Sequence, residues 1–219
     1  MVSKKNIDEV FKILKAETWK YEIPIVGKVA NKTKDPFKIL ISTMLSLRTK
    51  DTTTAKASDR LFKLGNKPED FLKLKDKTIE KAIYPVGFYR VKAKNIKLVC
   101  ADLVKTYNSK VPDNIDDLLK LRGVGRKTAN LVVILGFNKY GICVDTHVHR
   151  ISNRWGYVKT KMPDETELVL RKKLPKKHWK IINDLLVTYG QNLCVPVSPF
   201  CSICKLSGFC GRIGVIKHR

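Results

Sequence analysis

Apolar residues recur at helical spacing along most of the 219 residues of this chain. Between residues 91 and 107, for example, Ile96, Val99, Cys100 and Leu103 would share one face of a helix. Similar spacing recurs in residues 7–14, 115–121, 146–156, 163–175 and 176–190. The nine prolines mostly fall between such segments, where proline starts or ends helices. Because no alternating strand pattern and no internal repeat is present, the sequence predicts an all-α fold.

The first residues predict a helix that packs on the protein's own core. Charged residues are interleaved with Ile7, Val10, Phe11 and Leu14, so the segment lacks the unbroken apolar run and the small-residue cleavage site of a signal peptide. No stretch approaches the roughly 20 apolar residues of a membrane-spanning helix. We therefore expect an intracellular monomer of the cytoplasm or nucleoid, without membrane association. In such a compartment cysteines are expected to be free or metal-bound rather than paired in disulfides.

The charge balance is strongly basic. Lysine and arginine together number 44 against 20 aspartates and glutamates, so the formal net charge is +24. These basic residues are spread along the whole chain, which predicts a broad electropositive face rather than a basic tail. A charge of this size favours a polyanionic partner, and nucleic acid or an anionic membrane surface are the usual candidates.

Helical periodicity disappears in the last 26 residues, where cysteine, proline and glycine become more frequent. Cys194, Cys201, Cys204 and Cys210 have the spacing C-x6-C-x2-C-x5-C. Four thiolates in one short, proline-containing loop can wrap a single soft metal centre. The spacing alone leaves a structural zinc ion and an iron–sulfur cluster equally open. The two remaining cysteines, Cys100 and Cys143, lie in apolar surroundings and are expected to be inert core thiols.

The stretch "LRGVGRKTAN", residues 121–130, lies between two segments of helical spacing and so predicts a helix–hairpin–helix. Gly123 and Gly125 permit backbone conformations that other residues resist, and they allow backbone N–H groups to approach a ligand closely. The start of the second helix adds further N–H groups, which together suit a phosphodiester. A G-x-G pair by itself is equally typical of an ordinary turn. The net charge favours binding to the DNA backbone, a contact that positions a duplex without selecting bases.

Arg126 and Lys127 begin the second helix, where the helix dipole disfavours cations. Arg126 is either a phosphate partner or a solvated charge. An ammonium at Lys127, inside so basic a protein, should have its charged form disfavoured, and a partly neutral lysine is a nucleophile that can form an imine. A second phosphate-binding lysine is the other interpretation, and the residues alone favour it.

The stretch "VDTHVHR", residues 144–150, lies shortly downstream. Asp145 is expected to cap the next helix, a common structural role for aspartate. If Asp145 also faced Lys127, it could assist proton transfer or stabilise a developing cation. His147 and His149 are two residues apart, so on a helix they would point to different sides and make a poor metal pair.

Together these features resemble the endonuclease III family of DNA base-excision glycosylases, over nearly the whole chain. The resemblance includes the hairpin, the "VDTH" element, "LSLRTKD" at residues 45–51, "GFYRVKAKNI" at residues 87–96 and the cysteine spacing. It implies two α-helical domains with a DNA groove between them. Residues 29–139 would form a helical barrel that carries the hairpin, and residues 1–28 and 140–219 would form a second domain. By this resemblance the four cysteines hold a 4Fe–4S cluster.

The resemblance places the family's nucleophile on Lys127 and its essential carboxylate on Asp145. The implied reaction begins with a damaged pyrimidine flipped out of double-stranded DNA, because its sugar carbon is inaccessible in the stack. Lys127 then attacks C1′ and expels the base with help from Asp145, and the Schiff base undergoes β-elimination. The implied enzyme is a bifunctional DNA glycosylase and AP lyase that acts on oxidised pyrimidines and abasic sites.

Two positions depart from the usual family pattern. Arg48 stands where the family usually carries a glutamine that fills the space left by the flipped base, and Phe88 stands where the family places an apolar wedge, often leucine. An aromatic side chain can unstack bases as well as leucine can. The remaining DNA contacts that we assign are Arg122, Gly123, Gly125, Arg126 and His147.

Two alternatives remain at this point. A monofunctional mismatch or adenine glycosylase would release a base without cutting the strand, and Lys127 argues against it. A non-catalytic helix–hairpin–helix DNA-binding protein with a structural zinc would contain zinc but no inorganic sulfide.

Overall fold

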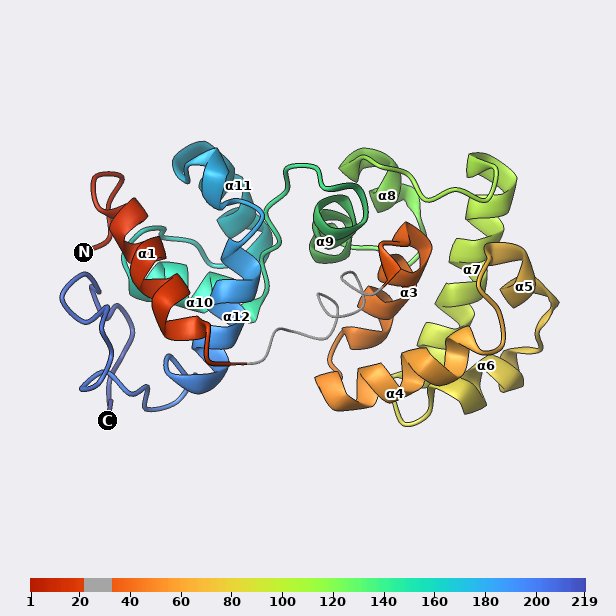
Figure 1. Cartoon of the computed structure of the whole chain (residues 1–219), viewed down its shortest axis with the longest axis horizontal. Helices are drawn as coiled ribbons and strands as arrows, with labels where there is room; N and C mark the ends of the chain where they lie inside the picture. Colours follow the sequence, from red (N-terminus) through yellow and green to blue (C-terminus); the bar gives the residue numbers. More distant parts are fainter. Residues whose placement is uncertain (22–32) are drawn as a thin grey trace. The chain divides into compact units, whose positions relative to one another are not determined.

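The computed structural model describes residues 1–21 and 33–219. These residues form helices, turns and loops and contain no strand (Figure 1), so the predicted all-α fold is confirmed for them. Within the same residues, no helix combines the length and the apolar composition needed to cross a membrane.

The chain divides into two compact units, which are described separately below. Unit 1 comprises Met1–Pro24 and Tyr140–Arg219, and unit 2 comprises Ile25–Lys139. The domain boundary that we predicted between residues 28 and 29 lies outside the described residues. The predicted division into domains therefore remains a prediction.

Unit 1 is built around a helix that packs against two others. Helix α12 (Ile182–Asn192) packs against α1 (Ile7–Thr18) and α10 (Thr146–Arg154). The remaining helices of the unit are α11 (Pro163–Lys173) and the short 3-10 helix η1 (Lys176–His178). The apolar face predicted for the first helix is fully buried in this core, which confirms that α1 packs on the protein itself.

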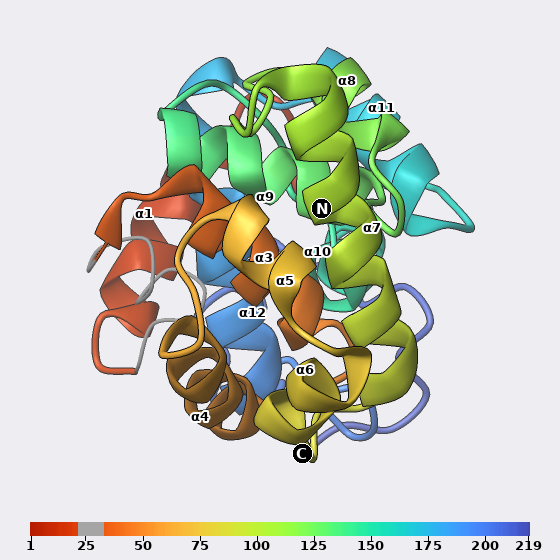
Figure 2. The ribbon, with the colours of Figure 1, turned by 90° about the vertical axis from the view of Figure 1, so that its right-hand side faces the viewer.

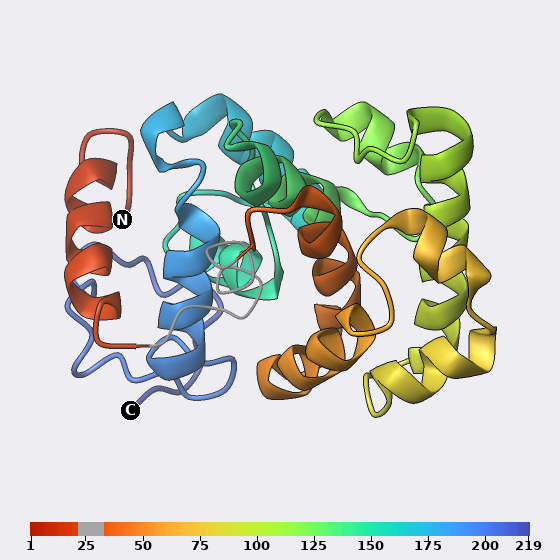
Figure 3. The same cartoon turned by 45° about the vertical axis from the view of Figure 1, so that its right-hand side comes forward.

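The C-terminal part of unit 1 contains no helix after α12. In Figures 1 and 3 it runs as a loop (dark blue) beside α1 and α12. Of its residues, Leu206 is completely buried in the core of the unit, and Lys205 forms an ion pair of 3.0 Å with Glu17 of α1. At the other end of α1, Asp8 contacts Lys177 and His178 at 2.7 Å each.

Unit 2 surrounds one helix that is apolar on nearly every side. This central helix is α3 (Pro36–Ser46), which begins at a cap where Asp35 Oδ1 accepts the N–H of Phe37 at 2.9 Å. It packs against α4 (Asp51–Phe62), α7 (Tyr89–Tyr107) and α9 (Arg126–Phe137), as Figure 2 shows. A helix that is hydrophobic all round belongs in a core. The other helices among the described residues of this unit are α5 (Pro68–Lys73), α6 (Asp76–Ile83) and α8 (Ile115–Lys120).

The face predicted for residues 91–107 is confirmed in α7, because Ile96, Val99, Cys100 and Leu103 are all completely buried. Burial raises the pKa of the Cys100 thiol to about 12, so this cysteine is an unreactive core residue at neutral pH. Cys143 of unit 1 is also completely buried. Both cysteines therefore have the surroundings that the sequence predicted.

Candidate functional site

The predicted helix–hairpin–helix is present in unit 2, where residues 121–125 join α8 to α9. Leu121 and Val124 are buried and anchor the hairpin, and Val124 N–H donates to the Leu121 carbonyl at 3.1 Å. Arg122, Gly123 and Gly125 are exposed. The apolar side chains thus fix the hairpin from below and leave its glycine backbone accessible to a ligand.

The two hairpin glycines serve different purposes. Gly123 has φ of +77°, and a Cβ at this position would lie 2.8 Å from Asn95 Nδ2 of α7, so its lack of a side chain is required by the fold. Gly125 is extended and is the N-cap of α9, and no described residue other than its two chain neighbours would lie within 4 Å of a Cβ built on it. The missing side chain at Gly125 is therefore not required by packing, and the space beside this N-cap is open.

Arg126 and Lys127 are the first two residues of α9, and both are partly buried. The next residues of this helix, from Thr128 to Ile134, are buried against unit 2. Asn130 Nδ2 donates to the Arg126 carbonyl at 3.0 Å and so reinforces the first turn. The backbone that carries Lys127 is consequently held both by the helix core and by this local contact.

Asp145 is the N-cap of α10 in unit 1, as predicted. Its Oδ1 accepts the backbone N–H groups of His147 at 2.8 Å and Val148 at 3.0 Å. Two such contacts fix the carboxylate at the positive end of a helix, where negative charge is favoured. The buried residues Ile142, Cys143 and Val144 precede Asp145 and anchor the segment.

The two histidines of the same helix have different neighbours. His147 Nδ1 lies 3.1 Å from a terminal nitrogen of Arg150, and a Cβ on Gly190 of α12 would come within 2.5 Å of it. His149 Nδ1 lies 2.7 Å from the Thr166 hydroxyl of α11. The two rings therefore do not face a common ligand position.

Arg48 and Phe88 lie together in unit 2. Arg48 lies in the loop after α3, and Phe88 directly precedes α7. Both residues have positive φ, +52° for Arg48 and +59° for Phe88, and both side chains are exposed. The Arg48 guanidinium carbon lies 5.8 Å from the centre of the Phe88 ring, within the range of a cation–π contact. The structure thus places side by side the two residues for which the sequence predicted insertion into DNA.

Beneath these loops lies Lys92, which the sequence interpretation missed. Its side chain is buried in α7, and its Nζ donates to the carbonyls of Leu45 and Leu47 and to the Thr49 hydroxyl. Burial lowers the pKa of Lys92 to about 8. A signal for it was present, since Lys92 precedes Ile96 by four residues and so lies on the apolar face of the helix.

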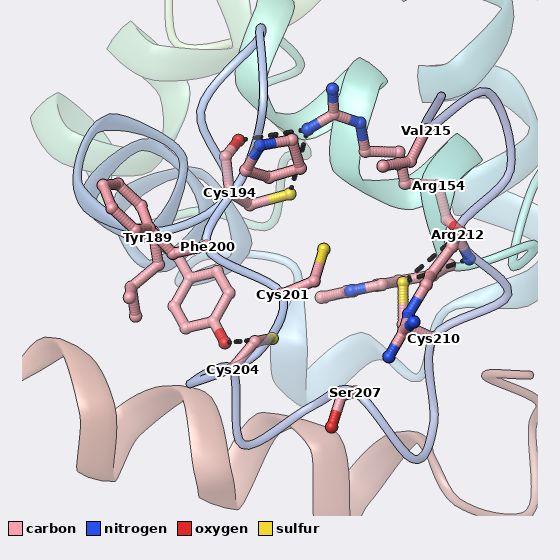
Figure 4. Close-up of a pocket in the computed structure, with 13 residues that line it drawn as sticks. Arg154, Tyr189, Cys194, Phe200, Cys201, Cys204, Ser207, Cys210, Arg212 and Val215 are labelled. Carbon is pink, nitrogen blue, oxygen red and sulfur yellow. Dashed lines mark hydrogen bonds between the residues drawn. The ribbon is translucent and has the colours of Figure 1, made fainter. Parts of the chain in front are cut away.

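The four clustered cysteines line a single pocket of unit 1. Figure 4 shows the sulfur atoms of Cys194, Cys201, Cys204 and Cys210 directed toward a common space inside the loop. Apolar side chains form most of the rest of the pocket, among them Leu193 and Val215. Among the described residues, no group of three or more histidine, cysteine or acidic side chains is arranged around a single-ion position.

Polar groups approach three of the four sulfur atoms. Arg154 donates to Cys194 Sγ at 3.3 Å, the Arg212 backbone N–H donates to Cys210 Sγ at 3.4 Å, and the Tyr189 hydroxyl lies 3.0 Å from Cys204 Sγ. Burial raises the pKa of Cys201 and Cys210, while the N–H groups of Arg154 and Arg212 stabilise negative charge on the sulfur atoms that they approach. Such N–H contacts to sulfur are typical of cysteine ligands. This donor set therefore fits a soft metal centre.

Arg154 also holds the loop itself. Its guanidinium donates to the carbonyls of Val195 at 2.8 Å and Pro196 at 2.6 Å, and Arg150 one turn earlier donates to the Cys194 carbonyl at 2.8 Å. The sequence interpretation missed both arginines, because arginines four residues apart on a helix ordinarily indicate a solvated face.

Residues 41–176 match the family model of the HhH-GPD superfamily of base excision DNA repair proteins. Endonuclease III of Thermotoga maritima is 48% identical over 180 residues, which cover 82% of this chain and 84% of that protein. The chain belongs to the endonuclease III family. Plant members of the family, such as one from Arabidopsis thaliana, are longer, and the match covers 47% of that protein.

Two solved structures of endonuclease III agree with this membership. A non-covalent endonuclease III–DNA complex is 35% identical, with a TM-score of 0.85, and a trapped endonuclease III–DNA covalent intermediate is 34% identical, with a TM-score of 0.84. Each match covers 96% of both chains. The resemblance inferred from the sequence is confirmed. As a member of the endonuclease III family, the chain is a bifunctional DNA glycosylase and AP lyase of base excision repair for oxidised pyrimidines.

Proposed function

We propose that this chain excises oxidised pyrimidines from double-stranded DNA with Lys127 as the nucleophile and Asp145 as the assisting carboxylate. The observation that carries the proposal is the place of Lys127 in the first turn of α9. This turn directly follows the hairpin, whose exposed Gly125 is the N-cap of α9. A phosphodiester bound by the N–H groups of that turn would bring a flipped nucleotide within reach of the adjacent lysine.

The proposed chemistry starts with the amine of Lys127. Its nitrogen forms a bond to C1′ while the bond between C1′ and the base breaks, and the base leaves with the electron pair. Asp145 stabilises the cationic character of the sugar. Opening of the sugar ring gives a Schiff base, and loss of a C2′ proton expels the 3′ phosphate and cuts the strand. The covalent DNA intermediate of a relative that is 34% identical supports this course.

The proposal assigns binding roles to the remaining predicted residues. Exposed Arg122 and the hairpin glycines contact the phosphate backbone together with Arg126, and His147 contributes beside Asp145. Arg48 and Phe88 enter the duplex at the damaged position.

We further propose that Cys194, Cys201, Cys204 and Cys210 bind a 4Fe–4S cluster. The convergence of four cysteines on one mainly apolar pocket supports this, as do the hydrogen-bond donors directed at their sulfur atoms and the family membership. Such a cluster would act as a cross-link that holds the cysteine loop in shape.

A panel of duplexes with a single lesion tests the activity. Oxidised pyrimidines, uracil, a G·T mismatch and an abasic site are compared, and base release and strand cleavage are measured separately. We expect coupled release and cleavage at oxidised pyrimidines and cleavage at the abasic site. Release by the wild-type protein without cleavage would instead identify a monofunctional glycosylase.

Elemental analysis tests the metal centre. The proposal predicts iron and acid-labile sulfide in equal amounts. A protein that contains zinc and no inorganic sulfide would contradict it and would favour a structural zinc site.

A further inference from the structure

Arg48 and Phe88 lie in two loops that are far apart in the sequence and contact each other. Leu47 to Lys50 follow α3, and residues 84–88 precede α7. Both Arg48 and Phe88 adopt positive φ, a conformation that is unfavourable for residues with a side chain and persists where the surroundings hold it. The contacts that hold these loops therefore decide how the two exposed side chains are presented.

The two loops touch through their backbones. A Cβ on Gly87 would lie 2.7 Å from the Arg48 carbonyl oxygen, so the close approach depends on a glycine at this position. The Gly87 N–H donates to the Thr49 hydroxyl at 3.1 Å. Thr49, the residue after Arg48, is thus hydrogen-bonded to Gly87, the residue before Phe88.

Lys92 completes this connection from below. Its ammonium has three N–H groups and three acceptors, namely the carbonyls of Leu45 at 2.8 Å and Leu47 at 2.5 Å and the Thr49 hydroxyl at 3.2 Å. Two of these acceptors are carbonyls at the end of α3, which lack partners within the helix and carry its negative partial charge. A buried lysine, costly in a core, is here satisfied by the loop that presents Arg48.

We propose that Lys92 and Thr49 lock Arg48 and Phe88 into one two-pronged wedge, with Lys92 as a positioning residue for damage recognition. This inference rests on the proposed function, because it assumes that Arg48 and Phe88 enter the duplex. Lys92 itself touches no DNA in this arrangement. It acts by holding both prongs at one separation, so that unstacking the duplex and filling the vacated space occur as a single event.

The test replaces Lys92 by methionine, an unbranched side chain one heavy atom shorter, which removes all three donors. The matched control is Lys97→Met, five residues further along α7, because Lys97 also donates to a carbonyl at a helix end, that of Leu74, away from the wedge. Binding is measured to a duplex with a stable abasic analogue and to an undamaged duplex. A fluorescent base analogue beside the abasic position reports unstacking.

We expect Lys92→Met to lower the ratio of damaged to undamaged binding about tenfold, the effect of losing roughly 1.4 kcal/mol of wedge interaction. The fluorescence change on binding should fall in parallel. Lys97→Met should leave the ratio and the fluorescence change within about twofold of the wild type, since the partners of Lys97, the Leu74 carbonyl and Asp76, belong to neither of the two loops.

A double-mutant cycle separates a positioning role from a purely structural one. The Arg48→Ala, Phe88→Ala background lacks both side chains that Lys92 is proposed to position. In this background Lys92→Met should have no further effect on the ratio of damaged to undamaged binding. An equal effect in both backgrounds would overturn the inference, as would an unchanged ratio in Lys92→Met alone. Thr49→Val removes the hydroxyl that links Gly87 to Lys92 and leaves the Lys92 contacts to the Leu45 and Leu47 carbonyls in place. If Lys92→Met fails to fold, the same cycle with Thr49→Val decides the question by the same outcomes.

Cleavage of an abasic site in single-stranded DNA distinguishes this inference from the proposed function. A single strand has no stack to open, so Lys92→Met should cleave it at the wild-type rate. If the wild-type protein cleaves the abasic site neither in a single strand nor in a duplex, the proposed function fails. If the wild type cleaves it and Lys92→Met binds damaged duplex normally, the wedge inference alone fails.

Discussion

The hairpin before α9 and the cysteine segment after α12 are both loops, yet they are held in different ways. The hairpin is short, and buried Leu121 and Val124 anchor it to the core of unit 2. The cysteine segment, residues 193–210, is longer, and only three of its residues are buried: Leu193, Pro199 and Leu206. Its shape depends instead on arginine contacts and on four cysteines that surround one pocket.

The hairpin and the cysteine segment therefore differ in what stabilises them. The hairpin is complete from its own backbone and apolar side chains, so a ligand can use it without having to form it. The cysteine segment has little core of its own, and loops of this kind are commonly completed by a metal centre whose binding energy is also folding energy. Mutations of hairpin residues that packing does not require, such as Gly125, should therefore affect binding, whereas loss of a cysteine should affect folding.

The largest effect that we expect comes from the cysteine segment. Cys201→Ala removes one ligand of the proposed cluster, so the protein should lose its iron and unfold at a much lower temperature. Iron content and thermal unfolding measure this. Cys143→Ala, at a buried cysteine outside the pocket, is the control and should retain full iron content. Wild-type iron and stability in Cys201→Ala would remove the contrast between the two loops.

The next effect concerns catalysis in unit 1. Asn is as good an N-cap as Asp, so Asp145→Asn should keep the contacts to His147 and Val148 and remove only the negative charge. Base release in single-turnover assays should fall roughly 10²- to 10⁴-fold, the usual range for such a group, with unchanged thermal stability. Base release at the wild-type rate in Asp145→Asn would show that only the cap matters.

The two hairpin glycines provide a sharper comparison within one loop. Gly123→Ala should lower the free energy of unfolding by about 1 to 3 kcal/mol, because φ is positive and Asn95 is too close. Gly125→Ala should cost less than about 1 kcal/mol and should weaken binding to undamaged duplex DNA. Denaturant unfolding and binding at fixed salt concentration measure the pair. The same loss of stability in both variants would contradict the assignment of Gly125 to the ligand.

The smallest effect tests a contact of unit 1 that involves no cysteine. Hydrogen bonds from Lys177 and then His178 hold the pKa of the Asp8 carboxyl below its usual value of 3.8. A carboxyl with a lowered pKa in the folded state stabilises the protein above pH 3.8 and loses this contribution as the pH falls through the lowered pKa. The wild type should therefore be slightly more stable than Asp8→Asn near pH 6, and the difference should vanish at acidic pH. A constant difference across this range would exclude the ionised carboxylate as its cause.

The sequence predicted those features that depend on local chemistry. Helical spacing predicted the α7 face, an aspartate before a helix predicted the Asp145 cap, and two glycines predicted the hairpin. Lys92 and Arg154 were missed because their partners are backbone carbonyls about 40 residues or more away, and a carbonyl leaves no mark in the sequence. Likewise, the contact of Arg48 with Phe88 depends on the packing of two distant loops. The spacing of the cysteines predicted a metal centre but could not distinguish zinc from iron and sulfide.

The central claim is that Lys127 forms a covalent bond with the damaged nucleotide. Borohydride reduces a Schiff base to a stable amine, so it should link the wild-type protein irreversibly to duplex DNA that contains an oxidised pyrimidine. Lys127→Ala should give no such product, while Arg126→Ala, its neighbour in the same turn, should still give it. A Lys127→Ala protein that is trapped as efficiently as the wild type would contradict the account.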